Sequence, residues 1–192
     1  MSAPITSICK EYLSIYPGEA DNLQPLLTQL MQKGEDTVRS RSEFDAGHIT
    51  AAAFILNSDL SKILLVDHGF LGKRIQPGGH SEPEDISILD TARREAQEET
   101  GLSHGQLKYL PVFPVSSQVP FHIDVHGFPA RPQKDEPEHL HFDFEYVFIA
   151  RDGVKVTAKP DESDAIQWVL FEEFAAFAEF AVQSEKLRNL LK

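Results

Sequence analysis

The chain has 192 residues and a net charge of −12, with Lys+Arg 18 against Asp+Glu 30. This length fits one ordinary domain, and a 41% hydrophobic fraction is enough for a sizeable core. The negative charge argues against nonspecific binding to nucleic acid or to an anionic membrane, so we expect no nucleic-acid and no membrane partner. Cys9 is the single cysteine, which excludes an internal disulfide and favours a reducing compartment. We see no signal peptide and no membrane-spanning run, and therefore expect a cytoplasmic protein.

The N-terminal part is predicted to be helical. Apolar residues recur at helical spacing within residues 4–33, Pro17-Gly18 interrupts them, and Gly34 follows as a cap. The polar segment 35–47 is expected to cross over to the next unit. We therefore divide the chain into an N-terminal helical extension, residues 1–45, packed on a main domain, residues 46–192.

The main domain alternates strand-like and helical segments. Residues 48–57 and 62–68 form a predicted hairpin, and a helix follows that begins near Asp85 with Ser87 as N-cap and Gly101 just beyond its end. Four more strands and a terminal helix are predicted at 107–116, 119–128, 139–150, 164–171 and 172–192. This order predicts an α+β fold with a mixed sheet packed between helices.

Three glutamates crowd onto one side of the internal helix. Glu95, Glu98 and Glu99 are three and four residues apart and therefore share a face, beside an apolar stripe. They repel one another and lie toward the end of the helix where its dipole disfavours anions. A divalent cation would relieve this conflict, and hard oxygen ligands suit Mg²⁺ or Mn²⁺. The alternative is an ordinary solvated face.

The stretch from Pro77 to Leu102 resembles the signature of the Nudix hydrolases, in which a glycine, an acid and then "RE..EE.G" form a loop, a helix and a loop. The matching positions are Gly79, Asp85, Arg94, Glu95, Glu98, Glu99, Gly101 and Leu102. The chain departs from the pattern at Asp85, where the family has glutamate, and in a spacing to Arg94 that is one residue longer. The resemblance covers residues 48–178.

The resemblance implies a Nudix-like αβα sandwich with a mixed β-sheet, plus the N-terminal helices. It implies a hydrolase that cleaves a diphosphate linkage in a nucleoside diphosphate joined to another group, a phosphate-containing small molecule, with Mg²⁺ or Mn²⁺ as cofactor. The implied metal ligands are Glu95, Glu98, Glu99 and the carbonyl of Gly79, and Arg94 belongs to the catalytic set. Glu162 either completes this site, with a role as general base open to it, or is an exposed acid of a turn. A homodimer is compatible with the sequence.

Two further segments carry alternating polar residues. His122, Asp124 and His126 share one face of a predicted strand, and His139, His141 and Asp143 share a face of the next. If the strands pair, the six side chains line one surface. This surface could hold zinc, form a substrate-contacting wall together with Arg74, Gln76 and His80, or be a solvated polar face. The arrangement also resembles a subgroup of Nudix-like sequences without a clear substrate.

Two other functions compete with the hydrolase. A Nudix-fold sensor would bind a nucleotide metabolite without cleaving it, but such sensors more often lose the acids that are intact here. An activity like that of isopentenyl-diphosphate isomerase requires a cysteine at the active site, and Cys9 is poorly placed for it.

Overall fold

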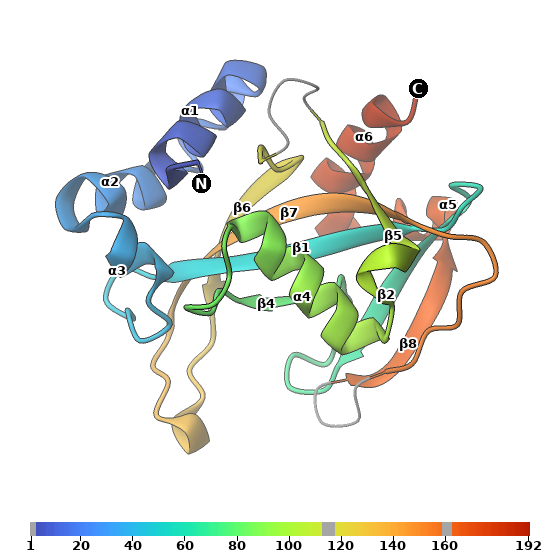
Figure 1. The fold of residues 1–192 in the computed structure, drawn as a ribbon. Coiled ribbons are helices and arrows are strands. Elements are labelled where there is room, and N and C mark those ends of the chain that lie inside the picture. Colours follow the sequence, from blue (N-terminus) through green and yellow to red (C-terminus); the bar gives the residue numbers. More distant parts are fainter. Residues whose placement is uncertain (1–2, 113–117, 159–162) are drawn as a thin grey trace.

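The computed structural model describes residues 3–112, 118–158 and 163–192. Within these ranges the chain forms one eight-stranded mixed sheet with helices on both faces (Figure 1). The strands are β1 (His48–Leu56), β2 (Lys62–His68), β3 (Lys73–Ile75), β4 (Gly78–His80), β5 (Leu107–Leu110), β6 (His122–Phe128), β7 (His139–Ala150) and β8 (Ser163–Leu170). The helices are α1 (Ile5–Ile15), α2 (Gln24–Lys33), α3 (Glu35–Arg39), α4 (Ile88–Thr100), α5 (Phe171–Phe174) and α6 (Ala181–Leu190), with short 3-10 turns between them.

The centre of the sheet is the pair β1 and β7, which run parallel, while every other pairing is antiparallel among the described strands. The main path is β3-β2-β1-β7-β5, with β4 beside the first half of β1, β6 beside β7 and β8 beside β2. The predicted hairpin of β1 and β2 and the α+β class are confirmed. The short strands β3 and β4 were not predicted from the sequence.

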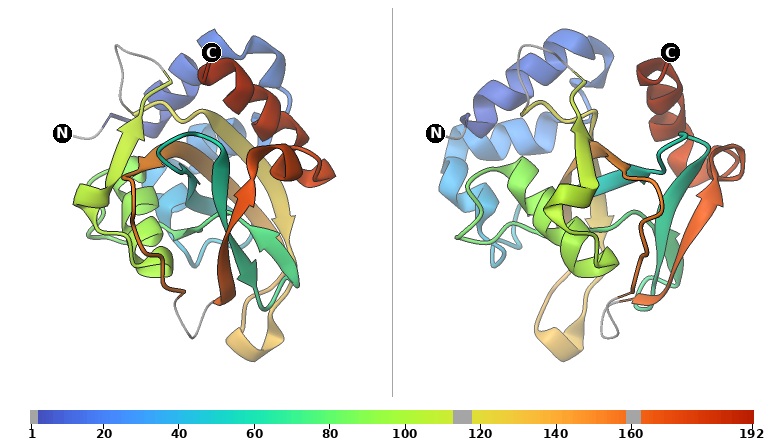
Figure 2. Two further views of the ribbon diagram at one scale, coloured as in Figure 1. Left: turned by 90° about the vertical axis from the view of Figure 1, so that its right-hand side faces the viewer. Right: turned by 45° about the vertical axis from the view of Figure 1, so that its right-hand side comes forward.

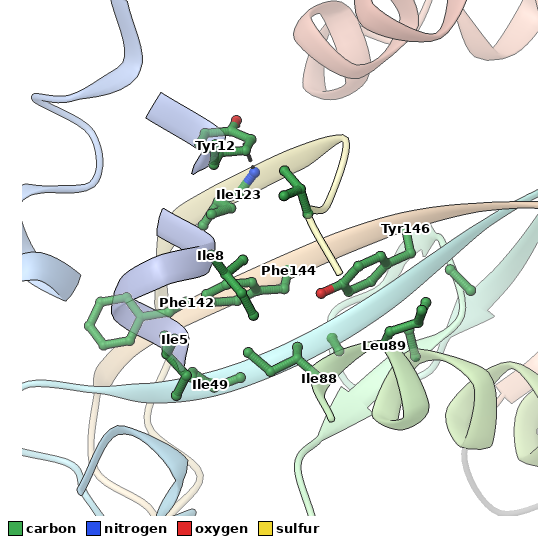
Figure 3. Close-up of a cluster of buried hydrophobic side chains, with 14 of the residues drawn as sticks. Ile5, Ile8, Tyr12, Ile49, Ile88, Leu89, Ile123, Phe142, Phe144 and Tyr146 are labelled. Carbon is green, nitrogen blue, oxygen red and sulfur yellow. Dashed lines mark hydrogen bonds between the residues drawn. The ribbon is translucent and has the colours of Figure 1, made fainter. Parts of the chain in front are cut away.

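One face of the sheet carries the main apolar core. Ile49, Ala51 and Ala53 of β1 alternate onto this face, and α1, α2 and α4 cover it (Figures 1 and 3). Figure 3 shows Ile5 and Ile8 of α1 packed over this face of the sheet. The N-terminal helices therefore share a core with the sheet, because their apolar stripe has no other partner.

The opposite face is divided. At one end a second core, built around Phe54, joins the sheet to α5 and α6, which lie on the side away from α4 (Figure 2). At the other end the same face is polar and carries His48, Thr50, His141 and Asp143 although all four are buried. A buried polar surface of this size is uncommon and calls for a functional or structural reason.

Two helical predictions are only partly right. Segment 35–47 was expected to be a polar crossover, but its first residues form α3, since Val38 is fully buried. The terminal helix is broken into α5, a 3-10 turn and α6, because Phe174 and Phe180 both turn into the second core. In the described ranges, no helix combines the length and the apolar character that crossing a bilayer requires.

Candidate active site

The site is built on α4 and the loop before it. Ser87 caps the helix by accepting a hydrogen bond from the backbone N–H of Asp90 at 3.2 Å, as predicted. Gly101 ends it in the left-handed conformation, with φ of 71°, where glycine has no steric penalty. Asp85, which was expected to begin the helix, lies in the preceding loop instead, because the helix begins at Ile88.

The glutamates of α4 do not all point the same way. Glu95 and Glu99 are buried against β4, where the backbone N–H of Gly78 donates to Glu99 Oε2 at 3.1 Å. A Cβ atom on Gly79 would collide with the carboxylate of Glu95, so any other residue here would force that carboxylate to move. The side chain of Glu98 is 39% exposed and lies on the Arg94 side. The sequence correctly predicted that the three acids lie on adjoining positions of the helix. It did not predict that they differ in burial.

Arg94 is the cation at the centre of this arrangement. Its Nε and Nη2 donate to the two oxygens of Asp85, and Nη1 donates to Glu95 at 2.8 Å and to Glu98 at 3.2 Å. Nη2 also donates to the carbonyl of His80 at 2.8 Å. Burial alone would lower the pKa of Arg94, but its carboxylate partners raise it, so the guanidinium stays charged. Arg94 therefore joins the loop, the helix and β4 into one unit.

Asp85 is held by further hydrogen bonds around its loop. It accepts from Thr91 Oγ1 at 2.9 Å and from the backbone N–H of Glu82 at 2.9 Å in addition to Arg94. Burial raises the pKa of Asp85, but these hydrogen bonds outweigh it and the pKa is lowered overall. The carboxylate is thus ionised and held from three sides. A hollow of about 300 Å³ lies beside it, bordered by Asp85, Arg94 and Glu98.

The family described as "NUDIX domain" matches residues 47–190, which is most of the chain. The chain belongs to the Nudix family. A search of curated protein sequences gave no match.

Solved structures share the Nudix fold with this chain. A Nudix-family hydrolase from Clostridium perfringens superposes with a TM-score of 0.56 at 21% identity, covering 76% of this chain and 98% of that one. The C. elegans Ap4A hydrolase, in a binary complex, gives 0.53 at 17% identity and covers 73% and 92%. The Nudix domain of Shewanella oneidensis NrtR, complexed with ADP ribose, gives 0.50 at 18% identity and covers 86% and 98%. At these identities the likeness shows the fold alone.

The polar face of this Nudix domain confirms the predicted pairing of the two histidine-bearing strands. In the β6–β7 register, His126 is opposite His141 and Asp124 is opposite Asp143, so the predicted side chains other than that of His122 share one face. The antiparallel pair also places His122 opposite Glu145. Glu145 was missed, although it follows Asp143 at the same two-residue spacing.

Strand β1 adds residues that the sequence analysis missed. His48 lies opposite His141 and Thr50 opposite Asp143 in the parallel β1–β7 pair, and Thr50 Oγ1 donates to Asp143 Oδ1 at 2.9 Å. On the other side of β1, Thr50 pairs with His80 of β4. The two-residue alternation in "HIT" was the available signal, but its partner strand is far away in sequence.

Burial is the main cause of the pKa shifts of five titratable side chains on the polar face. It lowers the pKa of His141 to about 2 and that of His80 to about 3, and it lowers that of His48 as well, so these imidazoles are neutral. It raises the pKa of Asp143 and raises that of Glu145 well above its usual value. His48, His80 and His141 are therefore available as neutral nitrogen ligands or hydrogen-bond partners. Burial also lowers the pKa of His126, but the carboxylates of Asp124 and Asp143 outweigh it and raise that pKa overall.

The remaining predicted residues are dispersed. Arg74 lies on β3 in an ion pair with Asp67 at 3.0 Å, at a cavity of about 400 Å³ that the glutamates of α4 do not border. Gln76 reaches the polar face, with Nε2 3.4 Å from Asp143 Oδ2. Glu162 lies outside the described residues. Cys9 is fully buried in the first core, which raises its thiol pKa to about 12 and leaves it no catalytic role.

His122 leaves the polar surface. Its Nδ1 lies 2.9 Å from Lys186 Nζ and 3.1 Å from the hydroxyl of Tyr12, under α1 and α6. Lys186 in turn forms an ion pair with Glu19 at 2.6 Å. This buried network joins the two ends of the chain and is structural.

Proposed function

We propose that this chain is a divalent-metal-dependent pyrophosphohydrolase that cleaves a diphosphate linkage in a substrate of the nucleoside diphosphate-X type. The single observation that carries this is the contact of Glu95 and Glu99 with the side-chain-free backbone of Gly78 and Gly79. Arg94 already pairs with Glu95 and Glu98, and a divalent cation would add further positive charge to the same buried cluster of carboxylates.

The donor set fits Mg²⁺ or Mn²⁺. We propose the carboxylates of Glu95, Glu98 and Glu99 and the carbonyl of Gly79 as the groups that hold it, all hard oxygen donors. Mg²⁺ keeps several waters and is bound through one or two carboxylates together with substrate phosphate oxygens. Such an ion, when bound, neutralises charge on the phosphate oxygens and lowers the pKa of water.

Side chains of the protein position the proposed metal ligands. Arg94, fixed by Asp85, aligns Glu95 and Glu98, and the bare backbone of β4 lets phosphate approach. For the proton acceptor we propose a glutamate of α4 or Glu162. His80 and Asp143 are proposed to contact substrate from the polar face, and Arg74 from the cavity at β3.

His139 and His141 were expected to contact substrate, to bind metal or to lie on a solvated polar face. Their rings face each other and His48, with Nε2 of His139 3.1 Å from Nε2 of His141. Since they converge on one another and are almost fully buried, the metal-binding alternative is favoured for both.

The alternative function is a non-catalytic module that senses a nucleotide metabolite. The fold likeness to the NrtR domain complexed with ADP ribose is the observation in its favour. The intact set of Arg94, Glu95, Glu98 and Glu99 favours the hydrolase.

The test is a substrate panel with Mg²⁺ or Mn²⁺ that includes ADP-ribose, Ap4A, nucleotide sugars and modified nucleoside triphosphates, with release of phosphate or nucleoside monophosphate as readout. We expect turnover of at least one compound, abolished by chelator, and a loss on the order of 10²–10³-fold in kcat for Glu98→Gln. Glu173→Gln, at an exposed position of α5, is the matched control and should be unchanged. Tight binding of one compound without turnover of any would support the sensor instead.

A further inference from the structure

Three histidines converge on the polar face of the sheet, opposite the face that α4 covers. His48 opens β1, and His139 and His141 lie at the start of β7. One ring nitrogen of each lies within 4.8 Å of the other two. Among the described His, Cys, Asp and Glu side chains, these three form the one group whose possible ligand atoms lie this close together. All three residues are buried.

The strand register produces this convergence. His48 and His141 are direct partners in the parallel β1–β7 pair, and His139 precedes His141 by two residues, on the same face. The site is therefore set by two central strands and not by mobile side chains alone, which is the kind of support a metal site requires.

Backbone carbonyls set the tautomers of two rings. Nδ1 of His48 lies 3.1 Å from the carbonyl of Glu43, and Nδ1 of His139 lies 2.7 Å from the carbonyl of Pro137. Because a carbonyl only accepts, both Nδ1 atoms carry the hydrogen, and both Nε2 atoms present a lone pair. A carbonyl partner on the far nitrogen is the usual support of a metal-bound imidazole.

The two Nε2 atoms differ in their partners within the protein. Nε2 of His48 is buried and has no hydrogen-bond partner. Because Nδ1 of His139 carries its hydrogen, Nε2 of His139 accepts a hydrogen bond from Nε2 of His141 at 3.1 Å; a bound cation would replace this hydrogen bond, with the hydrogen of His141 moved to Nδ1. In a tetrahedral zinc site, Zn–N bonds of about 2.0–2.1 Å put neighbouring nitrogens about 3.3 Å apart, close to this separation.

We propose that His48, His139 and His141 bind one Zn²⁺ through their Nε2 atoms, at a site distinct from the carboxylates of α4. Neutral imidazoles select zinc over magnesium, which prefers oxygen ligands. Three protein ligands leave the fourth position to water or another ligand. The inference does not depend on the proposed hydrolase activity.

The two sites face opposite sides of β4. Gly79 is directed at Glu95 of α4, whereas His80, the next residue, has its ring 5.0 Å from that of His48. Zinc would link the segment before β1 to the segment before β7. The carbonyl of Glu43 in the first segment already contacts the ring of His48, and the carbonyl of Pro137 in the second contacts the ring of His139. We therefore expect it to stabilise the fold.

The test uses the full-length, untagged chain, purged of metal with a chelator and then titrated with Zn²⁺. We expect one zinc per chain by elemental analysis, and a rise in Tm of about 5–10 °C at a hundredfold excess over Kd. Co²⁺ in place of zinc should give the strong visible absorption of tetrahedral coordination, which needs no variant protein.

Variants separate the histidine site from other sites. His48→Gln and His141→Gln should lose zinc binding and the cobalt absorption, while His104→Gln, at an exposed position, and Glu98→Gln should retain both. Absence of stoichiometric zinc and of tetrahedral cobalt absorption in the wild-type chain would overturn the proposal. Zinc binding that survives in both His48→Gln and His141→Gln would also overturn it. So would a wild-type chain that binds no zinc, combined with a raised KM for diphosphate compounds in these two variants.

Discussion

The guanidinium of Arg94 donates two hydrogen bonds to the carboxylate of Asp85, from Nε to Oδ1 at 3.1 Å and from Nη2 to Oδ2 at 3.0 Å. Such bidentate pairs are among the strongest in proteins because both hydrogen bonds are charge-assisted. The pair forms although Asp85 replaces the expected glutamate and its loop has an extra residue.

Removing this carboxylate charge should destabilise the protein and its site together. For Asp85→Asn we expect a loss of about 1–3 kcal/mol in the free energy of unfolding, because Asp85 is nearly buried and Arg94 would lose its ionised partner. Urea unfolding measures the stability, and Mn²⁺ titration measures the effect on the proposed metal ligands, which we expect to bind more weakly.

A neighbouring acid provides the control. Glu82 lies 3.8 Å from Arg94 but its side chain is 56% exposed, so Glu82→Gln should cost less than about 0.5 kcal/mol. Equal losses for Asp85→Asn and Glu82→Gln would show that the bidentate geometry contributes nothing specific.

Gly79→Ala should disable the site while leaving the fold intact. The added methyl group would displace the carboxylate of Glu95, and a shift of this size at a catalytic ligand costs on the order of 10²-fold in rate. Activity on whichever panel compound is turned over measures it. Gly105→Ala is the control, since a Cβ there meets nothing within 4 Å, and it should be silent. An unimpaired Gly79→Ala enzyme would remove Glu95 from the proposed ligands.

Local patterns predicted most of the elements and the acidic helix. The caps at Ser87 and Gly101 and the alternation in the two histidine-bearing strands are short-range signals, and each was confirmed. The different burial of Glu98 and Glu99 was not predictable, because it depends on where β4 passes. That strand is three residues long and carries two glycines, which leaves no periodic pattern to recognise.

The convergence of His48 with His141 could not be predicted from the sequence, for a different reason. It depends on a parallel pairing between strands that are far apart in sequence, and no local feature specifies the register. The two-residue spacing predicted that His139 and His141 share a face. It could not predict which strand lies next to them.

Lys186 should contribute strongly to the free energy of unfolding, because it links the N-terminal and C-terminal parts of the chain. Its Nζ contacts Glu19, Tyr12 and His122, and its side chain is only 10% exposed. For Lys186→Met we expect a loss of about 3 kcal/mol in the free energy of unfolding, because Glu19 and its partners are left without their cation. Urea unfolding measures it. Lys10→Met, at an exposed position of α1, is the control and should stay within about 0.5 kcal/mol.

The same network predicts a loss of stability in acid. Burial raises the pKa of Glu19, but hydrogen bonds from His122, Lys186 and Tyr12 outweigh it and lower the pKa to about 2, from 4.5 for an unperturbed glutamate. Protonation therefore favours the unfolded chain, so the stabilisation from Glu19 is complete above about pH 4.5 and disappears as the pH falls toward 2.

Unfolding in urea across this pH range tests the assignment. The difference in unfolding free energy between the wild type and Glu19→Gln should be constant above pH 5 and shrink steadily below pH 4.5. The exposed Glu185→Gln should stay within about 0.5 kcal/mol of the wild type throughout. A Glu19→Gln difference that does not change between pH 5 and pH 2.5 would mean that the carboxylate charge of Glu19 does not hold α1 and α6 together.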